Sequence, residues 1–493
     1  MSSTTAPYEM IVGLEVHVQL KTQTKLFCRT NAEFGAEPNT QSCPVCIGMP
    51  GTLPVMNLEA FQLALKTAVA INCAIPGFTK WDRKHYYYPD LPKGYQISQY
   101  DLPMSNDGFL EISDPKGEFP TKKVGIIRAH LEEDAGKSMH DEAAGKADSR
   151  IDLNRTGTPL LEIVSAPDMN SPKEAKAYLT ELKLLLEHLG VSDCNMQEGS
   201  LRVDANVNIK VDTPSGKVAT PIVEIKNMNS FRSVERAIAY EADRQLQVFK
   251  ETGKKLGDFP KQTRGWDDQA QVTRAQRHKE ESADYRYFPE PDLVPVLVTE
   301  EEIKRVRDAL GELPAQTRSR LGKDYALEGY EADVIVSQGK GFITYFETLA
   351  KKSGDAKRAS NWAQQDVLRV LNEAGQTIDR FPITAERLAE LLTAIGKGEI
   401  DTSRAKEVFA KMLESHESAG EIMKSMGIAA MDDSALITLC QELLSANPKI
   451  VADVKSGKEQ AVMSLIGQAR KKNPNATPNK VKEICLDLIK KLP

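Results

Sequence analysis

Strict alternation of apolar and polar residues in two distant segments constrains the fold of this chain more than any other feature. In residues 14–20, leucines and valines alternate with Glu15, His17 and Gln19, and residues 201–208 show the same alternation. Successive side chains of a β-strand point to opposite faces of the sheet. Each segment therefore predicts a strand with one apolar and one polar face. The polar set of the second segment is Arg202, Asp204, Asn206 and Asn208.

The pattern of the chain changes near residue 295. Before it, alternating strand segments mix with helices expected at 58–71, 171–189 and 231–251, which predicts an α+β fold with a mostly antiparallel sheet. Two prolines within 288–292 mark a boundary. The remainder is rich in helix-forming residues. We therefore expect three domains, at 1–295, 296–400 and 401–493, the last two all-α.

Composition excludes several classes of protein. The formal net charge of −6 argues against a chain that is basic throughout, so any contact with RNA must come from a local patch. No leader-like apolar segment opens the chain, and no apolar run is long enough to span a membrane. Seven cysteines, an odd number, are typical of a reducing compartment. We expect a cytoplasmic, multidomain protein without a membrane segment.

Carboxylates interrupt otherwise apolar strands. Glu162 lies within Pro-Leu-Leu-Glu-Ile-Val, Glu224 lies within Pro-Ile-Val-Glu-Ile, and an acidic run occupies 132–134. One interpretation is an ordinary solvated sheet face. The other is a cation site, because oxygen ligands with one imidazole suit Mg²⁺ or Mn²⁺. The sequence has no phosphate-binding glycine loop, so any ATP would be held by metal ions and side chains on the sheet.

Three further clusters each leave two interpretations open. Cys28, Cys43 and Cys46 have a zinc-like spacing but supply only three ligands, so the alternative is a zinc-free loop with leftover thiols. The aromatic and basic stretch 83–95 suits a loop over a phosphate or a base, or a proline-rich loop packed by tyrosines. The same ambiguity, phosphate clamp or solvated face, holds for 273–287, with Arg274, Arg277, Lys279 and Arg286.

The end of the chain is locally basic. After residue 469, seven basic residues face only two acidic ones. A basic segment on an acidic protein predicts an RNA contact. The residues expected to make this contact are Arg470, Lys471, Lys472 and Lys480.

Several blocks together resemble the GatB family, the B subunit of the glutamyl/aspartyl-tRNA amidotransferase. They are distributed in order over the N-terminal half of the chain. The matching blocks are Gly13–His17, Arg83–Gln99, His130–Lys137, Asp152–Arg155, Glu198–Arg202, Glu224–Phe231 and Asp284–Asp292. The resemblance implies a cradle domain akin to glutamine synthetase at 1–295, a helical linker and a tRNA-binding tail. It also implies two partners, an amidase A subunit and a small C subunit, and a mischarged tRNA as substrate.

The resemblance also implies site residues. The magnesium site of the family maps onto His17, Glu133 and Glu162, with Glu15, Glu198 and Glu224 as supporting carboxylates. Glu15, His17, Glu133 and Glu162 are the expected catalytic residues. The zinc knuckle of the family has four cysteines and begins Cys-x-Cys, whereas Cys28 is followed here by Arg29 and Thr30. The candidates for binding ATP or phosphate are Lys84, Tyr86, Lys93, Arg202 and Arg286.

The expected chemistry is activation of a carboxylate. A carboxylate reacts poorly with ammonia, so ATP and Mg²⁺ would convert the side chain of Glu on tRNA(Gln), or Asp on tRNA(Asn), into an acyl phosphate. Ammonia from the glutaminase partner would then displace the phosphate. Two alternatives are a stand-alone ligase acting on a small acid, against which the helical tail argues, and a non-catalytic tRNA-binding scaffold, against which the buried acids argue.

Overall fold

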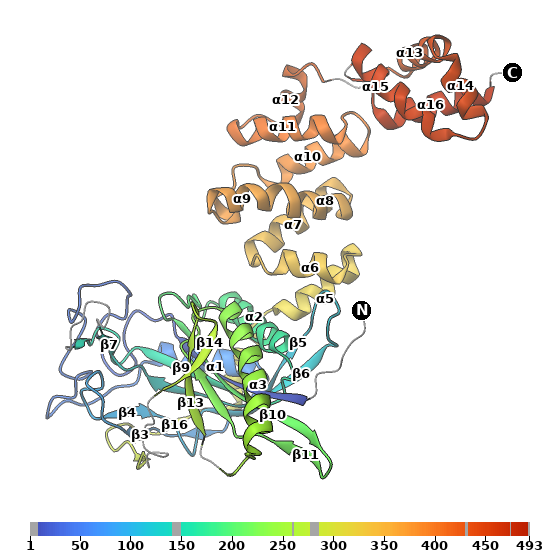
Figure 1. The fold of residues 1–493 in the computed structure, drawn as a ribbon. Helices are drawn as coiled ribbons and strands as arrows, with labels where there is room; N and C mark the ends of the chain where they lie inside the picture. Colours follow the sequence, from blue (N-terminus) through green and yellow to red (C-terminus); the bar gives the residue numbers. More distant parts are fainter. Residues whose placement is uncertain are drawn as a thin grey trace. The chain divides into compact units, whose positions relative to one another are not determined.

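The computed structural model describes residues 8–140, 149–258, 261–276, 285–428, 432–473 and 475–491. The chain divides into two compact units, Met1–Pro314 and Ala315–Pro493. The first contains all the described strands and the second only helices (Figure 1). The predicted fold class, α+β followed by an all-helical region, is confirmed.

One large mixed sheet forms the framework of the first unit. Its strands follow the order β14-β13-β12-β10-β1-β9-β6-β5, and β11 pairs with β10 outside this path. Every neighbouring pair is antiparallel except β12 and β13. The strands are β1 (Tyr8–Gln19), β5 (Ser105–Ile112), β6 (Lys122–Glu133), β9 (Pro159–Ser165), β10 (Leu201–Thr213), β11 (Gly216–Ala219), β12 (Val223–Lys226), β13 (Gln262–Asp267) and β14 (Val272–Ala275).

Short strands border this sheet. They join segments that are distant in sequence, since β15 pairs with β3 and β16 with β2. They are β2 (Phe78–Thr79), β3 (Asp82–His85), β4 (Tyr95–Ser98), β7 (Lys137–His140), β8 (Ser149–Asp152), β15 (Phe288–Pro289) and β16 (Val296–Leu297).

Helices cover the apolar face of the large sheet. Helices α1 (Leu58–Ala70), α2 (Pro172–Leu189) and α3 (Phe231–Thr252) share one hydrophobic core with the inward side chains of β1 and β10 (Figure 1). Val12, Val16 and Val207 are fully buried in it. This is the packing that the alternating pattern predicts, and it leaves the polar side chains on the opposite face.

The first unit extends beyond the predicted boundary at residue 295. Helix α4 (Glu300–Ala309) begins with a capping box at Thr299 and packs against α1. Its Ile303 belongs to the core of the sheet unit. The division therefore falls after Pro314, because an apolar face on α4 makes it a further layer of this unit.

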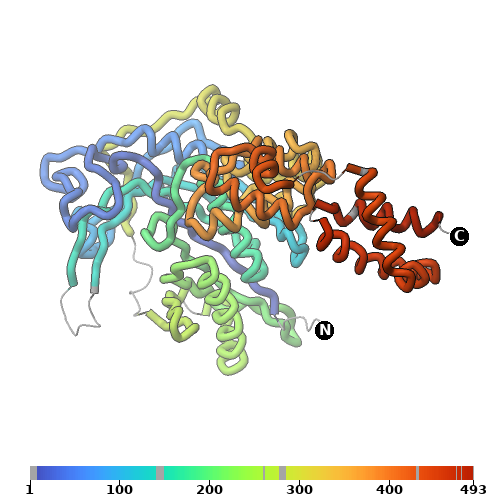
Figure 2. Tube along the Cα trace, turned by 90° about the horizontal axis from the view of Figure 1, so that it is seen from above, coloured from blue at the N-terminus to red at the C-terminus, as the bar shows by residue number. Residues whose placement is uncertain are grey.

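The second unit is helical throughout its described residues. Its helices are α5 (Pro314–Tyr325), α6 (Gly329–Val336), α7 (Lys340–Ser353), α8 (Ala356–Trp362), η2 (Ala363–Val367), α9 (Leu368–Ala374), η3 (Ile378–Arg380), α10 (Ala385–Gly396), α11 (Thr402–Glu414), α12 (Ala419–Ser425), α13 (Asp433–Ala446), α14 (Pro448–Lys455), η4 (Glu459–Val462), α15 (Met463–Lys472) and α16 (Pro478–Lys491). Helices α13–α16 gather into a group with its own hydrophobic core (red in Figures 1 and 2). The predicted tail domain at 401–493 stays a prediction. Among the described residues, we find no helix with the length and apolarity needed to cross a membrane.

Candidate catalytic site

A row of ionisable side chains crosses four strands on the polar face of the sheet. His130 of β6 lies opposite Glu162 of β9, Glu162 opposite His17 of β1, and His17 opposite Arg202 of β10. Directly opposed residues on neighbouring strands have side chains close enough to interact. Strand register alone therefore assembles this row from segments far apart in the sequence.

His17, Glu132 and Glu162 form the first group that could hold a metal ion. Their ligand atoms all lie within 4.8 Å of one another. Nε2 of His17 is 3.6 Å from Oε2 of Glu162 and 3.9 Å from Oε1 of Glu132. Nε2 of His130 is 3.3 Å from the same Glu162 oxygen. One carboxylate is thus shared between two imidazoles.

The electrostatics of this group favour an ionised Glu162. Burial opposes its charge, but His130 and His17 outweigh that effect and hold the pKa of Glu162 well below its usual value. Burial likewise opposes protonation of His17, yet the neighbouring carboxylates, Glu162 above all, raise the pKa of His17 to about 9. A metal ion bound here would take the place of the proton on His17, because an imidazole coordinates a metal only in its neutral form. A carboxylate set with one imidazole suits a hard divalent ion.

Glu15, Asp204 and Glu224 form a second carboxylate group on the same face. Their ligand oxygens also lie within 4.8 Å of one another. Nζ of Lys226 pairs with Asp204 and lies 3.4 Å from Oε1 of Glu224, and Nζ of Lys261 lies 3.2 Å from the same Glu224 oxygen. These ammonium groups oppose burial and lower the pKa of Glu224. Two lysines thus balance charge at a position where a metal ion could also bind.

A cavity of about 410 Å³ opens over this face of the sheet. Its lining joins His17 and Glu132 to Asp204 and Lys226, so it connects the two carboxylate groups. Arg202 also lines the cavity and donates a hydrogen bond of 2.6 Å to Asp134. The cavity is large enough for a nucleotide phosphate chain and an acyl group, and its walls combine acids with cations.

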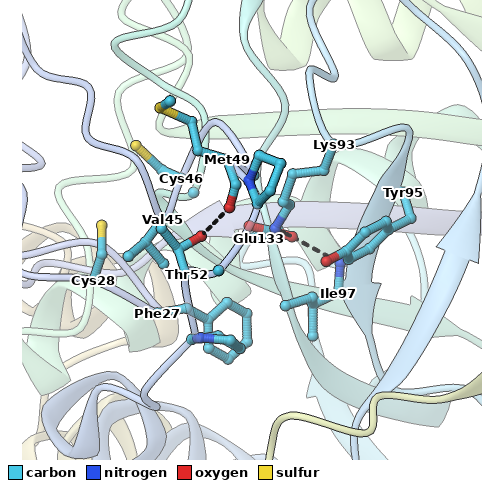
Figure 3. Close-up of a pocket in the computed structure, with 15 residues that line it drawn as sticks. Phe27, Cys28, Val45, Cys46, Met49, Thr52, Lys93, Tyr95, Ile97 and Glu133 are labelled. Carbon is cyan, nitrogen blue, oxygen red and sulfur yellow. Dashed lines mark hydrogen bonds and ion pairs between the residues drawn. The ribbon is translucent and has the colours of Figure 1, made fainter.

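Glu133 lies on the other face of β6 from Glu132. It pairs with Lys93 and accepts a hydrogen bond of 2.8 Å from the backbone N–H of Ile97. Its side chain is 2% exposed. Glu133 lines a separate cavity of about 190 Å³ together with Cys28 and Cys46 (Figure 3). The structure therefore brings Glu132, in place of the expected Glu133, to His17 and Glu162.

Some of the other predicted site residues line one of the two cavities, and others line neither. Lys84, Tyr86 and Arg202 line the larger cavity, and Lys93 lines the smaller one. Glu198 is exposed in the turn before β10 and belongs to neither carboxylate group. Arg286 is exposed, and its backbone carbonyl lies 3.0 Å from Nδ1 of His85. Two residues of the second basic cluster, Arg277 and Lys279, lie outside the described residues, as does Asp284.

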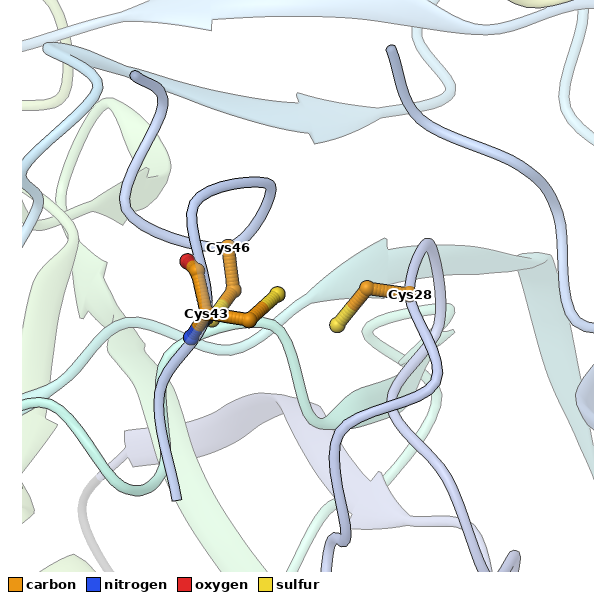
Figure 4. A group of neighbouring side chains, drawn as sticks. All are labelled: Cys28, Cys43 and Cys46. Carbon is orange, nitrogen blue, oxygen red and sulfur yellow. Dashed lines mark hydrogen bonds between the residues drawn. The ribbon is translucent and has the colours of Figure 1, made fainter. Parts of the chain in front are cut away.

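The structure also shows where the predicted cysteines and the predicted basic residues of the tail lie. Cys28, Cys43 and Cys46 place their sulfur atoms within 4.8 Å of one another (Figure 4). In the tail, Arg470 pairs with Asp401 at 3.2 Å and Lys472 with Glu442 at 3.1 Å. The exposed basic side chains of this region include Lys471, Lys482 and Lys490. The remaining predicted residue, Lys480, is half-buried.

Four of the residues that this geometry brings together were not among the predicted site residues: His130, Lys226, Glu132, which stood only in the acidic run 132–134, and Asp204, which stood only in the polar face. Each of them had a local signal in the sequence. Between residues 128 and 132, Ala129 and Leu131 alternate with His130 and Glu132, which places the latter pair on the polar face. For Lys226 the signal was its position two residues after Glu224 in the same strand.

Comparison with known proteins matches both units. A model described as the GatB/GatE catalytic domain covers residues 10–304, and one described as the GatB domain covers residues 344–489. The B subunit of an aspartyl/glutamyl-tRNA(Asn/Gln) amidotransferase from Rhodopirellula baltica is 62% identical over 486 residues, 99% of this chain and 98% of that protein. The protein of the same name from Carboxydothermus hydrogenoformans is 45% identical over 489 residues, with 98% and 99% covered.

Proposed function

The chain belongs to the GatB family of aminoacyl-tRNA amidotransferase B subunits, and on this premise we propose that it converts Glu-tRNA(Gln), Asp-tRNA(Asn) or both into the amidated forms. The enzyme class is a carbon–nitrogen ligase with glutamine as the nitrogen donor. The observation that carries this proposal is the cavity of about 410 Å³ over two carboxylate groups, which suits ATP-dependent activation of an acid.

The two carboxylate groups fit Mg²⁺. His17, Glu132 and Glu162 would hold one ion, and Glu15, Asp204 and Glu224 a second one in exchange for the lysine ammonium groups. Bound Mg²⁺ supplies neutralisation of phosphate charge during phosphoryl transfer. The protein contributes the position of each ligand, because every one of them is fixed by strand register.

Cations in the cavity complement a triphosphate. Lys84 and Arg202 line the same cavity as the carboxylates, and Lys226 lies between its two acidic partners. Arg202 is oriented by Asp134, which also accepts a hydrogen bond of 3.0 Å from the amide of Gln19. These side chains would bind the phosphates of ATP and align its γ-phosphoryl group with the substrate carboxylate, so that proximity lowers the barrier.

The smaller cavity suits the delivery of ammonia to the activated substrate. Ammonia must reach the acyl phosphate unprotonated and shielded from water. The buried Glu133 carboxylate already holds an ammonium group, that of Lys93, so the same pair of side chains could position a nitrogen nucleophile by hydrogen bonding. Glu133 would thus act on ammonia from an amidase A subunit, while Glu132, its chain neighbour, acts on the opposite face. A small C subunit would complete the assembly, and the exposed lysines of the tail would contact the tRNA.

The test is ATP hydrolysis by the full chain, co-expressed with its amidase partner, with glutamine and Mg²⁺ at fixed concentration. Glutamyl-tRNA(Gln) should stimulate hydrolysis and be converted to glutaminyl-tRNA(Gln), and uncharged tRNA should not. Hydrolysis stimulated by free glutamate without tRNA would instead show a small-acid ligase. Absence of Mg²⁺-ATP binding would show a scaffold.

A further inference from the structure

His130 is a buried histidine that contacts a proposed metal ligand from outside the substrate space. The residue is 2% exposed and lies directly opposite Glu162 in the pairing of β6 with β9. The described lining of the larger cavity includes His17 and Glu132 but not His130. The proposed reaction therefore gives the imidazole of His130 no role, although strand register holds it against a carboxylate that would bind the ion.

Two imidazoles hold the side chain of Glu162. Nε2 of His130 is 3.3 Å from Oε2 of Glu162 and hydrogen-bonds to it, and Nε2 of His17 is 3.6 Å from the same oxygen. Among the described residues, the Glu162 carboxylate has no other hydrogen-bond partner. Glu132 differs, because Oγ of Ser98 also donates to its carboxylate at 3.3 Å.

The orientation of the His130 ring makes it a donor to this group. Its Nε2 faces Oε2 of Glu162 and also lies 3.9 Å from Oε2 of Glu132, so this nitrogen carries a hydrogen. Nδ1 is buried and has no hydrogen-bond partner among the described residues. The polar contacts of the ring are therefore directed at the two carboxylates.

Metal binding increases the importance of this contact. An imidazole coordinates a metal in its neutral form, so an ion on Nε2 of His17 removes the hydrogen through which His17 contacts Glu162. His130 is then the remaining described donor to Glu162, whereas Glu132 keeps the hydrogen bond from Ser98. Hydrogen bonds of this kind orient metal ligands, and their loss typically weakens metal binding by about 10- to 100-fold.

We propose that His130 is a positioning residue that fixes the Glu162 carboxylate for a divalent cation and touches neither the cation nor the substrate. The inference rests on the proposed function, since it concerns the Mg²⁺ site of His17, Glu132 and Glu162. The loss of His130 should appear in metal affinity and not in the chemical step, because the same ligands surround the ion once its concentration is high enough to fill the site.

Manganese binding to the full-length chain, co-purified with its amidase partner, tests the proposal without turnover. Bound Mn²⁺ loses the sharp EPR signal of the free ion, so a titration gives the dissociation constant. His130→Leu keeps the size of the side chain and removes the donor, and should weaken one class of Mn²⁺ sites by about 10- to 100-fold. His130→Gln, whose amide N–H can take the position of Nε2–H, should bind Mn²⁺ nearly as tightly as the wild type. The matched control His188→Leu, in α2, should bind it equally tightly.

The Mg²⁺ dependence of ATP turnover separates positioning from a structural role. In His130→Leu, the Mg²⁺ concentration for half-maximal turnover should rise by about 10- to 100-fold, while turnover at saturating Mg²⁺ stays close to that of the wild type. Unchanged Mn²⁺ affinity in His130→Leu would overturn the proposal and leave the proposed function standing, as would binding by His130→Gln as weak as that by His130→Leu. Reduced turnover at saturating Mg²⁺ with unchanged metal affinity would also overturn it. A wild-type chain that binds no Mn²⁺ would overturn both the proposal and the metal-dependent function.

Discussion

Replacing Glu133 by glutamine tests whether the pair with Lys93 is a buried ion pair. The two side chains are 2% and 6% exposed, so water screens their charges weakly. The amide oxygen of the new side chain would still accept the hydrogen bond from Ile97, so Glu133→Gln removes the charge and little else. It leaves the ammonium group of Lys93 buried without a counter-charge. Breaking one side of a buried pair costs about 3–5 kcal/mol, and the adjoining cavity gives water some access, so we expect about 3 kcal/mol.

A double-mutant cycle isolates the interaction. Lys93→Met should cost about 3 kcal/mol for the same reason, because it leaves the carboxylate unpaired. The double variant should cost less than either single variant, and far less than their sum of about 6 kcal/mol, because no unpaired charge then remains buried. Urea unfolding followed by tryptophan emission gives each free energy. A Trp362→Phe background restricts the signal to Trp81 and Trp266, which both lie in the sheet unit.

Additivity would refute this reasoning. If the double variant loses the sum of the two single losses, the charges do not sense each other and the pair is solvated. If Glu133→Gln changes stability by less than about 0.5 kcal/mol, the carboxylate behaves as a surface group. Either result would also remove the basis for assigning Glu133 a role with ammonia.

Three further predictions concern other parts of the chain. Glu15→Gln should lower ATP turnover by at least about tenfold, because metal binding becomes weaker. The control is Glu9→Gln in the same strand, which should leave turnover unchanged because Glu9 pairs only with Lys217 at the surface. Equal turnover in the two variants would contradict a metal-binding role for the second carboxylate group. Asp134 has a lowered pKa because Arg202, Arg155 and Gln19 outweigh burial, so it stabilises the fold above its unfolded pKa of about 4 and ceases to do so as the pH falls through the lowered pKa. The acid side of the stability curve should therefore be shallower in Asp134→Asn, and a curve as steep as that of the wild type would contradict the ion pairs. In Gly467→Ala, the added Cβ atom within α15 has no other atom within 4 Å. The substitution should raise the free energy of unfolding of the helical unit by about 0.5–1 kcal/mol and its thermal midpoint with it. A lower midpoint would contradict this expectation.

Local signals made several elements predictable to within a few residues. Helix α2 begins after Ser171, whose side chain accepts the N–H of Glu174 at 3.2 Å, and ends at Gly190 with a left-handed φ of 70°. In such a cap a glutamate at this position can also return a hydrogen bond to the N–H of the capping residue. Here the Glu174 carboxylate accepts the N–H of Asn170 at 2.9 Å instead. Caps are local chemistry, and a sequence displays them directly.

The register of the strands and the unit to which each helix belongs were harder to predict from the sequence. The face of β6 to which each glutamate points depends on an irregularity between Ile126 and Arg128, where the pairing with β9 shifts. A shift of one residue exchanges the two faces, which decides whether Glu132 or Glu133 meets His17. Helix α4 belongs to the sheet unit because Ile303 packs there, a long-range contact that no proline signal at 288–292 reveals. The existence of a polar face on the sheet was predicted, but the full set of side chains on that face was not.

The row His130–Glu162–His17–Arg202 takes one side chain from each of four strands. Synthesis on the ribosome delivers these strands far apart in time, since β1 emerges first and Arg202 follows only after α2 is complete. A slipped pairing at any of the three junctions would turn its side chain away and break the row. A nascent or misregistered chain therefore lacks the intact row, so any ligand binding that uses all four side chains would require correct pairing at all three junctions.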